Sequence, residues 1–136
     1  MNVRRWVSAV AAGAALVTAG VVGGAVPASA DNGDGDVNCN LGEICFWRYS
    51  NAVLWTKQFW YTADHGGYTW WAGGATNVRV QDDAVDVTNR DTQCNVRVGD
   101  LSAATGIWTW RYFPNDQLRH ELGVIRNAND RHERCV

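Results

Sequence analysis

The sequence predicts an all-β fold, a sandwich of two antiparallel sheets held by disulfide bonds. Short segments rich in aromatic and β-branched residues recur along the chain, and glycine, asparagine or proline turn signals separate them. No segment shows the apolar spacing of an amphipathic helix. Four cysteines follow an N-terminal export signal, which favours a disulfide framework. The expected strands cover residues 44–49, 58–62, 68–71, 77–80, 85–88, 95–98 and 107–113.

The first 30 residues have the three-part pattern of a secretory signal peptide. Arg4 and Arg5 precede a long apolar run, and the small residues that end at Ala30 offer a cleavage site before a polar segment. The apolar run is also about long enough to span a bilayer, so an uncleaved membrane anchor is the alternative. The arginine pair leaves twin-arginine export open beside the general route. We expect cleavage after Ala30, a secreted extracellular protein, and no membrane contact after cleavage.

The chain that remains after cleavage is long enough for one domain with one modest core. Residues 31–38 are mostly Gly, Asp and Asn and predict a flexible N-terminus, and residues 39–136 form the predicted domain. Removal of both signal arginines leaves ten basic residues against fourteen acidic ones, a formal net charge of −4. This acidic balance argues against nucleic acid as a partner.

All four cysteines, Cys39, Cys45, Cys94 and Cys135, lie after the signal. An even number in a small exported domain predicts two disulfides. Three pairings are possible, and Cys39 with Cys45 is the easiest to close because only five residues separate the two; Cys94 would then pair with Cys135. A four-cysteine metal site does not fit, since no two cysteines have the two- to four-residue gap of such sites.

A weak internal repeat divides the predicted domain into two halves. The segment CFWRY begins at Cys45 and CNVRV begins at Cys94, and the pair Asp82–Asp83 in the first half corresponds to Asn129–Asp130 in the second. Two similar halves of under fifty residues each predict two Greek-key motifs packed on one core.

Three features carry a resemblance to a known family: the signal, the segment CNLGEICFW at 39–47, and DDAVDVTNRD at 82–91 ahead of CNVRV. With them the chain resembles the secreted βγ-crystallin-like peptidase inhibitors of actinobacteria, the metalloproteinase inhibitor family. The resemblance implies a βγ-crystallin-like pair of Greek keys and a loop or surface that occludes an extracellular metallo- or serine protease. The chain departs from the pattern in its second half, where Cys94 has no partner within ten residues to close a short loop.

The residues give no catalytic pattern. After the signal the only serines are Ser50 and Ser102, and neither lies in a G-x-S-x-G turn. Two disulfides would leave no thiol as a nucleophile, and His120–Glu121 lacks the second histidine of H-E-x-x-H. We therefore expect a protein that is not an enzyme and needs no cofactor.

Calcium is the one metal that the resemblance suggests, because βγ-crystallin-like domains can bind it through paired Asn/Asp motifs. The candidate ligands are oxygen donors, which suit Ca²⁺: Asp82, Asp83, Asn129 and Asp130. The hydroxyl residues that should follow each pair are absent, and arginines lie close by. The same residues are typical of turn caps, and we favour that interpretation.

Seven tryptophans follow the signal. Trp47, Trp60, Trp108 and Trp110 lie in strand-like runs, and we assign them to the core or its margin. Adjacent strand residues face opposite ways, so one of Trp70 and Trp71 should reach solvent. Exposed aromatic residues make good anchors for a protein or a sugar face. The candidate partner contacts are therefore Trp70, Trp71, Trp55, Asn95 and Val96.

The alternative to an inhibitor is a secreted binding module without inhibitory activity. The tryptophan excess favours a cell-wall glycan as its partner, and the acidic pairs favour a Ca²⁺-stabilised structural domain.

Overall fold

The computed structural model describes residues 38–50 and 53–136, so the predicted signal and residues 31–37 lie outside the described residues. The described chain is all-β with two short 3-10 turns, which confirms the predicted class. Within the described ranges no helix is long and apolar enough to cross a membrane.

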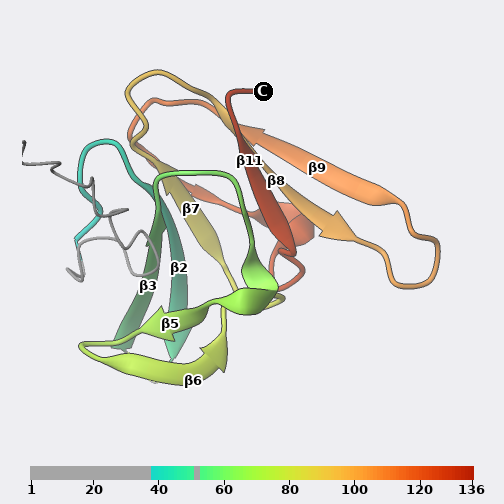
Figure 1. Ribbon diagram of the computed structural model, residues 1–136, viewed down its shortest axis with the longest axis horizontal. Coiled ribbons are helices and arrows are strands. Elements are labelled where there is room, and N and C mark those ends of the chain that lie inside the picture. Colours follow the sequence, from blue (N-terminus) through green and yellow to red (C-terminus); the bar gives the residue numbers. More distant parts are fainter. Residues whose placement is uncertain (1–37, 51–52) are drawn as a thin grey trace, which may run out of the picture.

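The strands form two antiparallel sheets (Figure 1). In order, the six-stranded sheet contains β10 (Arg119–Glu121), β7 (Asp86–Asn89), β2 (Ile44–Ser50), β3 (Val53–Phe59), β5 (Thr69–Trp71) and β6 (Ala75–Arg79). The four-stranded sheet contains β4 (Ala63–Asp64), β11 (Arg131–Arg134), β8 (Val96–Leu101) and β9 (Trp108–Phe113). The 3-10 turns are η1 (His65–Gly67) and η2 (Gly123–Ile125).

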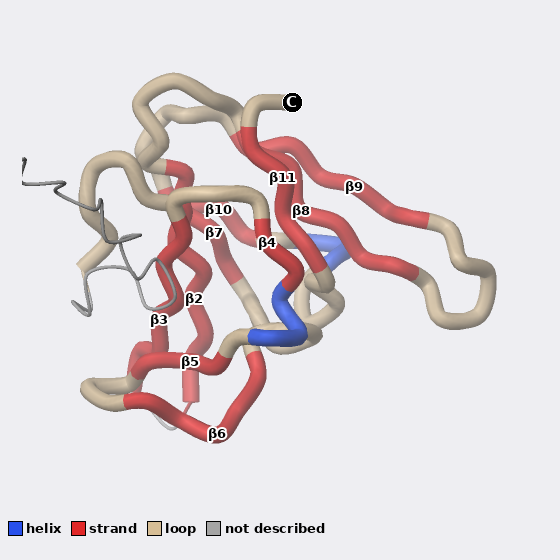
Figure 2. Tube along the Cα trace, in the orientation of Figure 1, coloured by secondary structure: helices blue, strands red, loops and turns tan. Residues whose placement is uncertain are grey.

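Each half of the chain contributes one strand to the other half's sheet. β4 of the first half pairs with β11, and β10 of the second half pairs with β7 (Figure 2). The remaining strands match pairwise: β2, β3 and β7 are connected in one sheet as β8, β9 and β11 are in the other. The first half has an additional hairpin, β5–β6, which joins the free edge of β3. Because of this exchange, neither half can unfold without breaking the sheet of the other.

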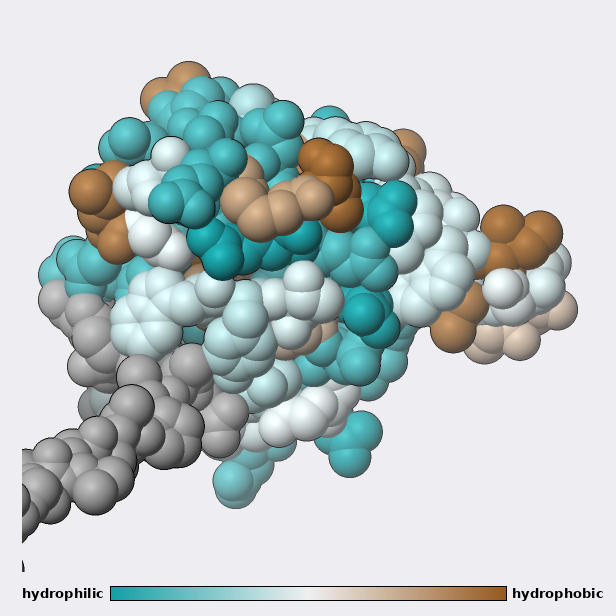
Figure 3. Space-filling view, turned by 45° about the horizontal axis from the view of Figure 1, so that its top comes forward, coloured by the Kyte–Doolittle hydropathy of each residue, from teal (hydrophilic) through white to brown (hydrophobic). Residues whose placement is uncertain are grey.

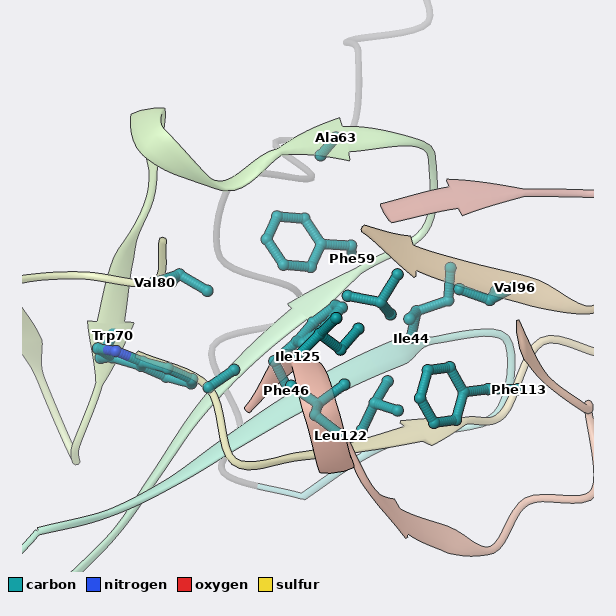
Figure 4. Close-up of a cluster of buried hydrophobic side chains, with 13 residues drawn as sticks. Ile44, Phe46, Phe59, Ala63, Trp70, Val80, Val96, Phe113, Leu122 and Ile125 are labelled. Atoms are coloured by element: carbon teal, nitrogen blue, oxygen red, sulfur yellow. The ribbon is translucent and has the colours of Figure 1, made fainter. Parts of the chain in front are cut away.

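The core lies between the two sheets (Figure 4). The two-residue period of a strand explains how it is filled, because Ile44 and Phe46 of β2 point into the core. The intervening Cys45 and Trp47 lie on the other face of β2, where they form a smaller cluster with Cys39. The remaining buried apolar residues of the core are Phe59, Ala63, Trp70, Val80, Ala84, Val87, Val96, Val98, Phe113, Leu122 and Ile125.

The disulfide pairing favoured by the sequence is confirmed. Cys39 pairs with Cys45, and Cys94 pairs with Cys135, which leaves no free cysteine in the part of the chain that the structure describes. Loop-closure entropy gives stabilisation of about 2 kcal/mol for the short loop and about 4 kcal/mol for the long one. The long-range bond joins the start of β8 to the C-terminus and so closes the whole second half.

Several strands differ from the sequence expectation, which did not include β4. Residues 53–57 extend β3, although the sequence indicated a strand only from residue 58. β10 and β11 were not predicted, because their sequences, RHE and RHER, read as polar loops. In β11 only His132 points into the core, while Arg131, Glu133 and Arg134 form ion pairs outside it. Side-chain pairing therefore makes a strand that hydropathy cannot reveal.

A chain of buried hydrogen bonds crosses the core between the two halves. His132 Nε2 lies 2.6 Å from the carbonyl oxygen of Tyr61, which can only accept, so this nitrogen carries the proton. The other nitrogen, Nδ1, therefore accepts from His65 Nε2 at 2.8 Å. His65 Nδ1 in turn accepts from Asn129 Nδ2 at 2.8 Å, which is nearer than the carbonyl oxygen of the same residue at 3.2 Å. Both imidazoles are thus neutral and fully paired.

Burial keeps the two histidines uncharged. Desolvation lowers the pKa of His65 to about 4. Desolvation, together with the neighbouring His65, lowers the pKa of His132 well below its usual value of 6.5. Both rings pack against Phe46 and Phe59, whose apolar surfaces cannot solvate a positive charge.

The histidine pair predicts a specific loss of stability in mild acid. As the pH falls below 6.5, the unfolded chain binds protons at His65 and His132 that the folded protein excludes. The free energy of unfolding should therefore decrease as the pH decreases, by up to about 1.4 kcal/mol per pH unit for each histidine. Urea denaturation at a series of pH values between 6.5 and about 5 measures this slope. His132→Gln should reduce the slope, whereas an equally stable protein throughout this range would contradict the assignment.

Candidate functional site: the β8–β9 arm

The most prominent feature of the surface is a hairpin that projects from the body of the protein. β8 and β9 pair over six residues each, from Val96 opposite Phe113 to Leu101 opposite Trp108, and extend beyond the other strands of their sheet (Figure 1). We call residues 96–113 the arm, and residues 102–107 its loop. The sequence analysis placed candidate contacts at Asn95 and Val96, and the structure shows that they lie at the start of β8, at the other end of the arm from the loop.

The loop and the residues beside it form an apolar tip. Leu101 is 40% exposed and Ile107 is 66% exposed, and Ala103 and Ala104 between them are also exposed. Figure 3 shows brown, hydrophobic side chains at the end of a projection from a largely hydrophilic surface. Small and aliphatic side chains at the end of a projection can enter a cleft that a flat surface cannot reach.

Hydrogen bonds hold the loop in one compact shape. Ser102 N donates to the carbonyl of Ile107 at 3.0 Å, and Gly106 N donates back to the carbonyl of Ser102 at 2.8 Å. Gly106 has φ of +66°, a backbone conformation that favours glycine. Thr105 N also donates to the Ser102 hydroxyl at 3.3 Å. A loop tied internally in this way loses little conformational entropy when it binds.

The base of the loop is fastened to the body by Asp130. Its Oδ2 accepts from the backbone N–H of Leu101 at 2.7 Å, and its own N–H donates to the carbonyl of Gly99 at 2.9 Å. Its Oδ1 accepts from Gln81 Nε2, in the first half of the chain. Asp130 directly follows Asn129, so the buried polar chain and the anchor of the arm share one turn.

Stacked side chains stiffen the outer face of the arm. The Trp108 and Trp110 rings stack with their centroids 4.8 Å apart, and the Arg97 guanidinium lies 4.3 Å from the Trp110 centroid. The β8–β9 register places Arg97 and Trp108 on opposite sides of Trp110, so both faces of this ring are covered. Arg97 is held in turn by Glu133 of β11. The stack therefore links the arm to the body and leaves no free Trp110 face for a sugar ring.

Gly99 makes this stack possible. A Cβ atom at this position would lie 2.6 Å from the Trp110 ring and 2.9 Å from the Trp108 ring. The absence of a side chain in the middle of β8 is therefore what lets both indoles lie across the strand. The two-residue period of β9 places Trp108 and Trp110, which the sequence analysis assigned to the core or its margin, on the same face as Tyr112. That face is the outer one, however, and Phe113 on the opposite face enters the core.

A groove of about 520 Å³ runs beneath the loop. Its charged lining consists of Asp82, Asp100 and Asp130. Partial desolvation raises the pKa of Asp82, and the negative charges of Asp130 and Asp100 raise it further. The groove is thus acidic, beside an apolar tip.

The four predicted calcium ligands separate into two pairs. Asp82 and Asp130 line the groove together with Asp100, which the sequence analysis did not single out. Asp83 instead binds Arg48 at 2.9 Å and accepts from the Trp70 indole at 2.8 Å. Asn129 Oδ1 accepts from the backbone of Asp83 and Ala84, which is the turn-capping role that we favoured. The expectation that the protein needs no calcium stays a prediction.

Two predicted partner contacts are corrected by their burial. Trp70 and Val96 are both fully buried, so neither can touch a partner. Trp70 is buried because its ring closes the core where β5 pairs with β3, with its N–H satisfied by Asp83 (Figure 4). Val96 is buried because it lies on the inner face of β8.

The other predicted contacts are accessible but do not form one surface. Trp71 and Trp55 are half-buried on the six-stranded sheet, with Arg48 stacked 4.7 Å from the Trp55 centroid. Asn95 is exposed at the end of β8 that is remote from the loop. The sequence analysis missed the loop because LSAATG carries no aromatic or charged signal and its projection depends on the length of both strands.

Comparison with known proteins identifies no relative. No family model matches the chain, and no curated protein or solved structure is significantly similar to it.

The role of Gly99 can be tested by Gly99→Ala. The added methyl group would push the Trp108 and Trp110 rings off β8, and we expect a loss of about 1–3 kcal/mol in the free energy of unfolding. Gly67→Ala is the matched control, because a Cβ there meets nothing within 4 Å. Chemical denaturation followed by tryptophan fluorescence compares the two variants. Equal stability of both would show that the indoles do not require the space above Gly99.

Proposed function

We propose that the protein is a secreted inhibitor of an extracellular metallo- or serine protease, and that the loop of the arm occludes the active-site cleft. The observation that carries the proposal is the apolar, internally hydrogen-bonded tip at the end of a stiff projection. An inhibitor must enter a cleft without a large ordering cost, and a preformed loop meets that need. The loop takes the place of the short disulfide-closed loop that the second half lacks.

The two disulfides support export, because such bonds persist in oxidising compartments. We propose further that the strand exchange between the halves represents two βγ-crystallin-like Greek keys. Support comes from the matching connectivity of β2, β3, β4 and β7 with β8, β9, β10 and β11.

The stack of Arg97, Trp110 and Trp108 gives the loop mechanical support. A projection held by one strand pair alone would bend, whereas this stack joins the outer face of the arm to Glu133 on β11. On the other side, Asp130 fixes the backbone at Leu101. The loop would therefore meet a protease in a single orientation, which limits the entropy lost on binding.

The test is inhibition by protein purified from culture medium, measured against a panel of secreted metallo- and serine proteases. Ile107→Glu places a charge at the apolar tip, and we expect at least a tenfold rise in the inhibition constant, about 1.4 kcal/mol. Leu41→Glu is the matched control, since Leu41 is similarly exposed but precedes β2, far from the arm. Both variants should keep the melting temperature of the parent. Lack of inhibition of every protease at micromolar concentration would contradict the proposal.

A further inference from the structure

The arm has a second unusual feature, which is the free edge of β9. The two sheets end in four edge strands, β10, β6, β4 and β9. β4 has two residues and β10 has three, and the β5–β6 pair contains a register shift. β9 is the longest of the four, with six residues paired to β8 in unbroken register. Its other edge pairs with no strand of the described chain, as Figure 2 shows.

The first half of the chain shows what such an edge accepts. β3 occupies the position in its sheet that β9 occupies in the other, and the far edge of β3 pairs with β5 in antiparallel orientation. The same position in the second half is occupied by no strand from residues 38–50 and 53–136. The fold therefore has one site where an antiparallel strand is added and one equivalent site where it is not.

β9 has only one of the features that usually prevent strand addition, a single inward-pointing charge at Arg111. Exposed edges are commonly protected by proline, lysine, a bulge or a covering segment. The sequence WTWRYF contains neither proline nor lysine, and its pairing with β8 has no bulge. Its one charged residue, Arg111, is turned toward its own body, where it donates to the carbonyl of Glu121 at 3.2 Å. Aromatic residues and threonine give this strand a high β-propensity.

We propose that β9 pairs in antiparallel orientation with β9 of a second copy of this chain, with Trp110 opposite Trp110. This two-fold register places Trp108 of each copy opposite Tyr112 of the other on the outer face. The Trp108 and Trp110 rings lie over Gly99 of their own chain, so Tyr112, which is 63% exposed, is the aromatic side chain of this face that would pack against the partner strand. On the inner face it places Thr109 opposite Arg111, so no like charges meet. A register centred on Arg111 would instead bring the two arginines together.

The result is one continuous eight-stranded sheet across two protomers. The contact is limited to a strand pair and its side chains, so the dimer is weak and its population depends on concentration. Because the two strands run in opposite directions, the two loops 102–107 point to opposite ends and stay exposed. Dimerisation is thus independent of the inhibitory role and compatible with it.

The experiment compares two variants that place opposite charges at position 109. Thr109 is exposed, and Asp100 lies opposite it on β8 of the same chain. In the dimer, Thr109→Arg brings two arginine pairs together, and Thr109→Glu creates two attractive pairs with Arg111. We expect the dimer dissociation constant, measured by sedimentation equilibrium, to rise about fivefold for Thr109→Arg and to fall about fivefold for Thr109→Glu.

Monomer stability separates this effect from a change in folding. Within one chain, Asp100 attracts the arginine and repels the glutamate, so the melting temperatures of the dilute variants should move in the direction opposite to their dimer affinities. A parent protein that remains monomeric at millimolar concentration would overturn the proposal. So would dissociation constants that follow the melting temperatures. Ile107→Glu should leave the dimer intact, so failure of inhibition and failure of dimerisation are distinguishable.

Discussion

The fold depends on the side chain of Asn129, which holds the two halves together where they meet. Its amide nitrogen donates to His65 and to the carbonyl of Val80, and its oxygen accepts from two backbone N–H groups of the first half. All four hydrogen-bonding positions of a fully buried amide are therefore satisfied. Any other side chain here would leave several buried partners without a hydrogen bond, each at a cost of about 1–3 kcal/mol.

Asn129 affects both the position of the exchanged strand β4 and the base of the arm. Through His65 and His132 it connects the turn after β4 to the strand β11, so the exchanged strand is fixed from both ends. Through its neighbour Asp130 it fixes the base of the arm. The orientation of the proposed inhibitory loop is thus set by the same turn that joins the sheets, which explains how a loop without its own disulfide can be presented rigidly.

The sequence predicted what depends on composition and short spacing. The β class and the presence of two disulfides follow from turn residues and cysteine positions, whereas the sequence left three pairings open and only favoured Cys39 with Cys45 as the easiest to close. It could not predict β11, whose charges are neutralised by residues distant in sequence such as Asp91 and Asp64. Nor could it tell Trp70 from Trp71, because the period of a strand gives two faces without saying which one meets the core. For a similar reason the sequence could not predict the exposure of the arm loop, because that exposure depends on how the strands assemble into the sheet.

The neutral histidine pair links Asn129 to β11 through hydrogen bonds of fixed direction, and ¹⁵N NMR of the imidazole side chains tests this link directly. At pH 6 the account predicts that His65 and His132 are both neutral with the proton on Nε2. It also predicts a coupling across the hydrogen bond from His65 Nε2 to His132 Nδ1. A protonated imidazolium at either residue, or a proton on Nδ1 of His132, would contradict it.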